Sequence, residues 1–154
     1  MSRAFVKEQD GAESDDLPER PVSRHRNLVT PEGLIRIEQM VRGLGLQLAE
    51  ARAADDRAAV ARVERDLRYW TRRKATAELV PRTPRPERVR FGCRVELETD
   101  TGERVSFRIV GEDESDPSQG LISYVSPLAE LLIGSKPGDR VSFRQGQAEI
   151  VGID

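Results

Sequence analysis

Two runs of apolar residues with heptad spacing, separated by a short polar turn, constrain the fold of this chain more than any other feature. The first run contains Leu34, Ile37, Val41, Leu44, Leu48 and Ala51. The second run has the same spacings and contains Val60, Val63, Leu67, Trp70, Lys74 and Ala77, with Lys74 interrupting the apolar series. Because such spacing lines one face of a helix, the two runs predict an antiparallel coiled-coil hairpin over residues 30–80.

Local signals mark the ends of both predicted helices. Thr30 can cap the first helix, and Pro31 suits the first helical position because it has no N–H to lose there. Three prolines within 81–88 end the second helix and predict a stiff connector over this stretch. Each arm then contains about 20 residues and is about 30 Å long.

Asp55 and Asp56 lie in the turn between the helices, and two interpretations of them stay open. The local interpretation is that one of the two carboxylates caps the second helix, as aspartate often does. The functional interpretation is that carboxylates at the end of an arm hold Mg²⁺ or orient a water molecule in a site of another protein.

Beyond residue 88 the hydrophobic period changes from helical to strand-like. Residues 89–110 predict two strands joined by a tight turn at 100–102, and residues 121–125 predict a third strand. Residues 140–153 predict a closing hairpin. Residues 89–154 are therefore predicted to form a mainly antiparallel sheet.

One short helix is predicted at 126–134, within the sheet region. Ser126 is placed to cap it, Pro127 to occupy its first position and Gly134 to end it. The chain as a whole is therefore predicted to be α+β, with an N-terminal helical hairpin and a C-terminal sheet that carries one short helix.

Charge is unevenly distributed along the chain, although the net charge is only −2. Residues 55–94 carry 12 basic and 6 acidic side chains, whereas residues 95–154 carry 5 and 12. On the second helix Arg62, Arg65 and Arg72 lie on one side of the apolar seam. A solvated flank of a coiled coil explains this stripe, and contact with nucleic-acid phosphates explains it equally well.

The sequence contains no glycine-rich phosphate loop, nucleophile elbow or cluster of metal ligands. His25 has no cysteine or histidine partner nearby in the sequence, which argues against a metal ligand. We therefore predict a protein that is not an enzyme and has no cofactor of its own. Its single cysteine, Cys93, and the lack of an apolar signal core or membrane-spanning run predict a cytoplasmic protein without membrane contact. We also expect a monomer. The polar composition of residues 1–29 predicts a flexible tail.

Residues 28–154 resemble, in order, the bacterial Gre transcript-cleavage factors GreA and GreB. The resemblance rests on LVTPEG at 28–33, DLRYWTRR at 66–73, FGCRVELETDTGERVSFRIVG at 91–111 and the pattern Ser-Pro-x-Ala-x-x-Leu-(Leu/Ile)-Gly…Gly-Asp within 121–143. By these motifs the sequence is more similar to GreB-like than to GreA-like proteins.

The resemblance implies that residues 89–154 have an FKBP-like fold and dock on bacterial RNA polymerase near the mouth of its secondary channel. The docking surface implied by position consists of Ser126 and Pro127, with Leu128 and Leu131 beneath them. The hairpin would then enter the channel. Its basic side chains would contact the channel or the phosphates of nascent RNA, and the candidates are Arg57, Arg62, Arg65 and Arg72.

The sequence departs from the family pattern at the hairpin tip. The usual tip reads Gly-Asp-x-x-Glu-Asn-Ala-(Glu/Asp)-Tyr, and Asp56 is the counterpart of its aspartate, whereas Ala59 stands in place of its glutamate. Each arm is also about ten residues shorter than usual, or roughly 15 Å. Since a carboxylate binds Mg²⁺ only within about 2.1 Å, we expect the protein to modulate transcription by occupying the channel, with weak or no stimulation of cleavage.

Two alternatives stay open. In the first, the protein is a true cleavage factor for backtracked complexes, and Asp55 and Asp56 hold Mg²⁺ that is shared with the polymerase active site. In the second and less favoured one, the FKBP-like fold indicates a peptidyl-prolyl isomerase. Fold alone does not determine function, and the sheet has few aromatic residues with which to line a proline pocket.

Overall fold

The computed structural model describes residues 17–154, which form two compact units. One unit contains residues 17–22 and Gln39–Arg72, and the other contains Ser23–Glu38 and Arg73–Asp154. Helix α1 (Pro31–Ala53) and helix α2 (Arg57–Thr76) each contribute residues to both units.

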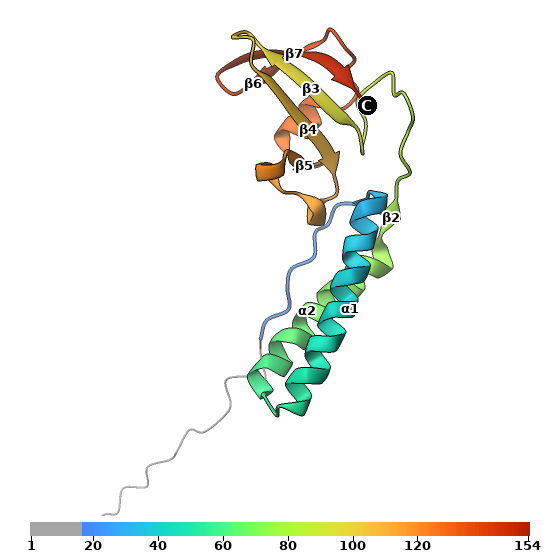
Figure 1. Ribbon diagram of the computed structural model, residues 1–154, viewed down its shortest axis with the longest axis vertical. Helices are drawn as coiled ribbons and strands as arrows, with labels where there is room; N and C mark the ends of the chain where they lie inside the picture. Colours follow the sequence, from blue (N-terminus) through green and yellow to red (C-terminus); the bar gives the residue numbers. More distant parts are fainter. Residues whose placement is uncertain (1–16) are drawn as a thin grey trace, which may run out of the picture. The chain divides into compact units, whose positions relative to one another are not determined.

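The first unit is built on the two predicted helices, which run antiparallel and are joined by a short turn (Figure 1). The apolar seam of α1 is buried at Leu44, Leu48 and Ala51. The facing seam of α2 is half-buried at Val60, Val63, Leu67 and Trp70. The heptad pattern therefore predicted the paired faces of this hairpin correctly, because burial of one stripe per helix is the main source of its stability.

The seam prediction is wrong at its fifth position on α2. Lys74 is exposed, whereas the neighbouring Arg73 is only 2% exposed. Arg73 belongs to the second unit, where its guanidinium group pairs with Asp113. A partner from a distant part of the chain therefore decides which of the two cations is buried.

The second unit contains a five-stranded sheet with the order β5-β4-β3-β7-β6. The strands are β3 (Arg94–Thr99), β4 (Arg104–Val110), β5 (Leu121–Ser123), β6 (Arg140–Phe143) and β7 (Gly146–Ile153). Strands β4 and β5 are parallel, and every other neighbouring pair is antiparallel. The predicted α+β class is thus confirmed, with one parallel pair in a mainly antiparallel sheet.

The third predicted strand is two residues too long. It ends at Ser123 because the chain turns there, and the backbone N–H of Ser126 donates to the carbonyl of Ser123 at 2.9 Å. The turn places Ser126 directly before helix α3 (Pro127–Leu132).

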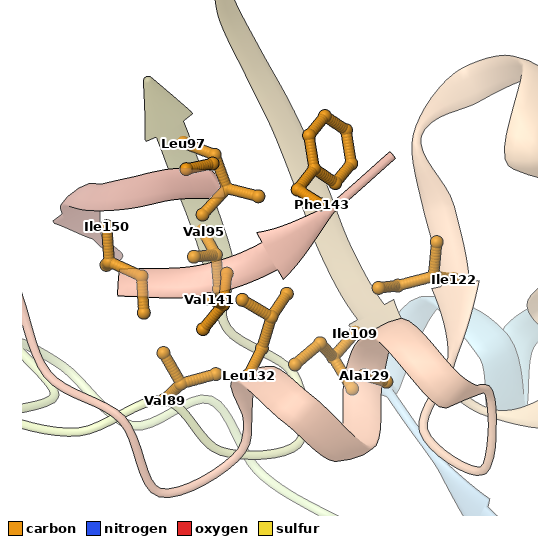
Figure 2. Packing of buried hydrophobic residues seen from close by; sticks show 11 residues of the cluster. Val89, Val95, Leu97, Ile109, Ile122, Ala129, Leu132, Val141, Phe143 and Ile150 are labelled. Carbon is orange, nitrogen blue, oxygen red and sulfur yellow. The ribbon is translucent and has the colours of Figure 1, made fainter. Parts of the chain in front are cut away.

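The core of this unit lies between the sheet and α3 (Figure 2). Ala129 and Leu132 of the helix are 0% exposed and pack in one cluster with Ile109, Val141 and Ile150 of the strands. Full burial of one such aliphatic side chain contributes about 1.5–3 kcal/mol. This packing fixes the rotation of the short helix and therefore decides which of its side chains face outward.

A second, two-stranded sheet pairs β1 (Leu28–Val29) with β2 (Glu78–Leu79) in parallel. The sequence did not predict this pair, because two-residue strands carry no detectable periodicity. Part of the predicted tail therefore belongs to an ordered element, and Val29 is buried. The part of that tail at 1–16 lies outside the described residues. Two short 3₁₀ helices, η1 (Glu112–Glu114) and η2 (Pro117–Gln119), occupy the acidic stretch before β5.

Candidate functional site

In the turn at the hairpin tip, Asp55 ends α1 and Asp56 caps the start of α2. Asp55 has φ +50°, the left-handed conformation that follows a helix C-terminus, and its N–H donates to the carbonyl of Arg52 at 3.1 Å. The N–H of Asp56 donates to the carbonyl of Ala51 at 3.0 Å, which completes a Schellman arrangement at the end of α1. The carboxylate of Asp56 then accepts the N–H of Ala59 at 3.0 Å and so caps α2. Asp56 therefore provides the cap that the local interpretation assigned to one of the pair, and Asp55 forms the turn before it.

The cap gives a direct prediction for Asp56. Asp56→Ala is expected to lower the free energy of unfolding of the hairpin by about 1 kcal/mol, because a helix N–H loses its acceptor. Asp56→Asn is the matched control and is expected to leave stability nearly unchanged, since asparagine caps equally well. Urea unfolding followed by circular dichroism measures both. Equal stability of the alanine and asparagine variants would contradict the capping role.

The two aspartates face different grooves of the hairpin. Asp56 lies in one groove with Arg62 and Arg65, and Asp55 lies in another with Arg57. The structure therefore brings together only part of the predicted basic stripe. Arg62 is exposed, but Arg65 is half-buried and its guanidinium group is 3.2 Å from the carboxylate of Asp66. Arg72 is exposed on the same helix.

Helix α3 presents the predicted docking residues in two different ways. Ser126 caps the helix by accepting the N–H of Ala129 at 3.3 Å, and Pro127 is exposed at the first helical position. Leu128 is half-buried against the core. Leu131 was expected beneath the serine and proline, but it is 52% exposed. Because Ala129 and Leu132 lie on the side of the helix that faces the core, Leu131 lies on a different side and faces solvent.

A buried carboxylate that no sequence pattern predicted, Glu114, lies at the start of α1. Thr30 caps this helix, because the N–H of Gly33 donates to its hydroxyl oxygen at 3.0 Å. Glu114 of η1 in turn accepts the hydroxyl of Thr30, the N–H of Thr30 at 3.1 Å and the N–H of Gly111 at 3.1 Å. The N-terminal end of a helix dipole favours a negative charge there. Glu114 therefore ties the start of α1 to the loop before β5.

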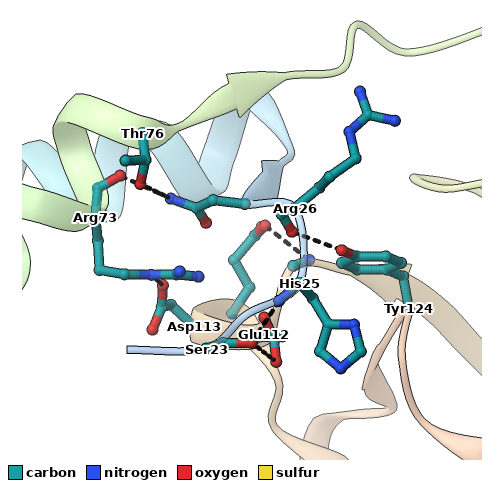
Figure 3. Close-up of polar contacts among 11 residues, drawn as sticks. Ser23, His25, Arg26, Arg73, Thr76, Glu112, Asp113 and Tyr124 are labelled. Atoms are coloured by element: carbon teal, nitrogen blue, oxygen red, sulfur yellow. Dashed lines mark hydrogen bonds and ion pairs between the residues drawn. The ribbon is translucent and has the colours of Figure 1, made fainter. Parts of the chain in front are cut away.

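A second buried contact joins the end of α2 to the same loop (Figure 3). The Nε of Arg73 donates to a carboxylate oxygen of Asp113 at 2.5 Å. Asn27 donates to the carbonyl oxygen of Arg73 at 2.7 Å and to the hydroxyl of Thr76 at 3.2 Å. We name Asn27, Thr30, Arg73, Asp113 and Glu114 the arm-root network. The acid-rich composition of 111–115 was the only sequence signal for it, and that composition is equally typical of a solvated loop.

The side chain of Tyr124 adds a further contact in the same unit. Its hydroxyl donates to the carbonyl oxygen of Arg26 at 2.5 Å, which attaches β1 and the residues before it to the region after β5. Burial raises the pKa of the Tyr124 hydroxyl, so this group stays protonated and remains a donor at neutral pH.

Across residues 17–154, no group of three or more histidine, cysteine, aspartate or glutamate side chains is arranged to bind a metal ion. None of the helices described within this range is long and apolar enough to cross a bilayer.

Comparison with known proteins identifies the relatives of this chain. A family model described as "Transcription elongation factor, GreA/GreB, C-term" matches residues 84–153. Over 148 residues the chain is 34% identical to the transcription elongation factor GreA of Anaeromyxobacter sp. (strain K), and the match covers 79% of this chain and 85% of that protein. This chain belongs to the GreA/GreB family of transcription elongation factors. The resemblance inferred from the sequence motifs is therefore confirmed.

Both branches of the GreA/GreB family occur among the relatives. The chain is 32% identical over 134 residues to the transcription elongation factor GreB of Haemophilus influenzae, with 75% of this chain and 85% of that one covered. Since this identity is close to that with GreA, the greater similarity to GreB-like proteins stays a prediction. The chain spans 44% and 51% of the length of two further curated relatives.

The solved structure of the GreA factor homolog 1 (Gfh1) protein of Thermus thermophilus also matches. It is 21% identical to this chain, the match covers 84% of this chain and 99% of that one, and the TM-score is 0.41.

Proposed function

We propose that this Gre-family protein binds bacterial RNA polymerase at the secondary channel and modulates transcription mainly by occupying it, with weak or no stimulation of transcript cleavage. The observation that carries the proposal is the geometry of the tip. Asp55 ends α1 in a left-handed conformation and Asp56 caps α2, so both aspartates have structural roles there. The third residue after Asp56, where relatives carry a glutamate by resemblance, is Ala59.

The tip offers few carboxylate ligands to a metal ion held by the polymerase. One oxygen of Asp56 already accepts the N–H of Ala59, and Asp55 faces a different groove from Asp56. Mg²⁺ requires near-octahedral oxygen ligands and is usually bound through one or two carboxylates together with water or phosphate. Asp55 and Asp56 could therefore at most add one ligand each to such an ion, which supports occupancy over cleavage.

The exposed side of α3 supports docking of the second unit on the polymerase. Pro127, Leu131 and Ile133 are exposed there, although the last two are large and apolar. Contiguous apolar side chains on a surface are typical of protein interfaces. In the proposed complex Ser126 and Leu128 hold this surface in place. Ser126 caps the helix and Leu128 packs on the core.

The basic side chains of α2 support the proposal that the hairpin lies against negatively charged groups in the complex. Arg57, Arg62 and Arg72 are exposed along the helix, and Arg65 lies in the groove with Arg62. In the proposed complex these four side chains contact the channel or RNA phosphates. The protein is proposed to act as a monomer in the cytoplasm, without a cofactor of its own.

A cleavage assay on stalled, backtracked elongation complexes tests the proposal. We expect the protein to bind core polymerase and to leave the RNA essentially unshortened over the time in which a cleavage-active Gre factor shortens it completely. Leu131→Ser is expected to weaken polymerase binding without changing the fold, because this side chain is exposed. Failure of the unaltered protein to bind core polymerase would overturn the proposal.

The alternative cleavage mechanism requires its own control, because simple tip variants also remove a helix cap. The double variant Asp55→Gly, Asp56→Asn removes both negative charges but keeps the turn, since glycine suits the left-handed position and asparagine caps. If the unaltered protein cleaves efficiently and this variant does not, the tip carboxylates hold Mg²⁺ and the occupancy mechanism is wrong.

A further inference from the structure

Residues 17–22 lie along the side of α2 in the first unit (Figure 1). The carboxylate of Glu19 accepts hydrogen bonds from Arg68 at 2.9 and 2.6 Å. The guanidinium group of Arg20 lies 4.0 Å from the ring centroid of Tyr69 and 5.8 Å from that of Trp70, and it is also 3.5 Å from Asp66. We name residues 17–22 the N-terminal strap.

The start of the strap borders a cavity that extends toward the hairpin tip. Leu17 lines a cavity of about 390 Å³ together with Asp55 of the tip and with Arg57 and Arg68 of α2. The strap therefore contacts α2 directly at Asp66, Arg68, Tyr69 and Trp70, and its first residue borders the cavity that Asp55 and Arg57 also line.

The surface beneath the strap has the chemistry of a single-strand binding surface. Arg57 and Arg68 supply cations, and the rings of Tyr69 and Trp70 stand edge to face with centroids 5.2 Å apart. Helix α2 is basic as a whole, with seven basic and two acidic side chains at 57–74. Single-stranded nucleic acids bind to such combinations, in which cations contact phosphates and bases stack on aromatic rings. We name Arg68 and Tyr69, with Arg57 at the edge of the adjoining cavity, the strap-covered face.

The strap makes the two kinds of contact with this face that RNA would make. The carboxylate of Glu19 occupies the position of a phosphate on Arg68, and the planar guanidinium group of Arg20 covers Tyr69 as a base would. The hydrogen bonds from Arg68 lower the pKa of Glu19, so the carboxylate remains charged at neutral pH.

The contacts that hold the strap on α2 are weak, so another ligand can replace them. The Glu19–Arg68 pair is exposed on both sides, and the Arg20–Asp66 pair is partly exposed. Exposed ion pairs are individually weak and are screened by salt. A polyanion with several phosphates would therefore compete effectively for Arg68.

We propose that the N-terminal strap is a displaceable cover over an RNA-binding surface, and that single-stranded RNA occupies the strap-covered face when the strap is released. This proposal rests on the proposed function, which already places Arg57 near the channel or RNA phosphates, and it adds the regulation of that surface by the strap. It assigns Arg57 and Arg68 to phosphates and the ring of Tyr69, which Arg20 covers at 4.0 Å, to a base. Charge complementarity favours RNA over an acidic protein, since both phosphates and stacking bases match groups that the strap now engages.

Fluorescence anisotropy with a labelled single-stranded oligoribonucleotide tests the proposal in the absence of polymerase. The full chain with Glu19→Ala and Arg20→Ala is expected to bind the oligonucleotide about tenfold more tightly than the unaltered chain at low salt. Adding Arg68→Ala is expected to abolish this gain. Higher salt is expected to weaken binding, because phosphate contacts release counterions.

The chain offers a matched control in Glu103 and Arg144, an exposed pair at 2.9 Å in the second unit. Glu103→Ala with Arg144→Ala removes the same charges and is expected to leave RNA binding unchanged. Circular dichroism checks that the hairpin stays helical. If the strap double variant unfolds, Glu19→Gln keeps the side-chain size and is expected to give a smaller gain of about threefold.

Two results would overturn the proposal. The first is equal RNA binding by the unaltered chain and by folded strap variants. The second is a gain that appears only with core polymerase present, which would make the strap-covered face a protein interface. The first result is obtained without polymerase and bears only on RNA binding, whereas polymerase binding by the unaltered chain, measured separately, tests the proposed function.

Discussion

Replacing Arg73 with alanine is expected to lower the free energy of unfolding of the second unit by about 3–5 kcal/mol, because it removes a buried guanidinium group and the ion pair that this group makes with the half-buried Asp113. Arg73 is 2% exposed, and Asp113 is 12% exposed. The change also leaves room where the guanidinium group and its aliphatic stem were packed. Urea unfolding followed by circular dichroism and by fluorescence measures the effect.

The neighbouring Lys74 provides the control for Arg73. Lys74→Ala removes the same charge one residue further along α2, but this side chain is exposed and we expect a change within about 0.5 kcal/mol. Replacing both Arg73 and Asp113 with apolar residues is expected to cost less than the sum of the single changes, because residues in direct contact are coupled. Additive effects would show that the pair does not contribute as a unit.

Replacing Glu114 with alanine is expected to lower the free energy of unfolding by about 3 kcal/mol or more. The change removes the acceptor for both the hydroxyl and the N–H of Thr30 and for the N–H of Gly111. Thr30 and Gly111 are buried, and each buried donor without a partner costs about 1–3 kcal/mol. The start of α1 also loses a negative charge that its dipole favours. Thermal and urea unfolding measure the loss.

The close approach of Glu114 to Gly33 supplies an independent check on the same carboxylate. A Cβ atom at Gly33 would lie 2.1 Å from the carboxyl carbon of Glu114. That carboxylate cannot move aside without breaking its hydrogen bonds, so Gly33→Ala is expected to destabilise the unaltered protein by about 1–3 kcal/mol. In the Glu114→Ala background the same change is expected to have little effect. Equal effects in both backgrounds would contradict the contact.

Together these two predictions define the physical role of the loop before β5. Asp113 and Glu114 are adjacent in η1, and they contact the end of α2 and the start of α1 respectively. The ends of both helices that belong to the second unit are therefore fixed by one short acidic segment.

The elements whose signals are local were predictable from the sequence. The heptad spacing gave the paired faces of α1 and α2, because each helix can bury only one stripe. Ser126 and Pro127 marked the start of α3, and Asp56 marked the start of α2, since capping depends on residues within one turn of the cap. The family motifs within 28–154 identified the relatives that the comparisons confirm.

What the sequence could not decide depends on contacts between segments far apart in the chain. The choice of Arg73 over Lys74 as the buried cation follows from Asp113, which is 40 residues away, and the role of Glu114 follows from Thr30, 84 residues away. The exposure of Leu131 follows from the packing that buries Ala129 and Leu132 against the sheet. Periodicity and capping are properties of a single helix or strand, whereas these side chains take their environment from whatever the fold places opposite them. The sequence by itself therefore determined the family, the arm and the acid pair at its tip. Only the tertiary structure decided how the acid pair is used, how the helix ends that belong to the second unit are held, and which part of α2 the residues before the hairpin contact.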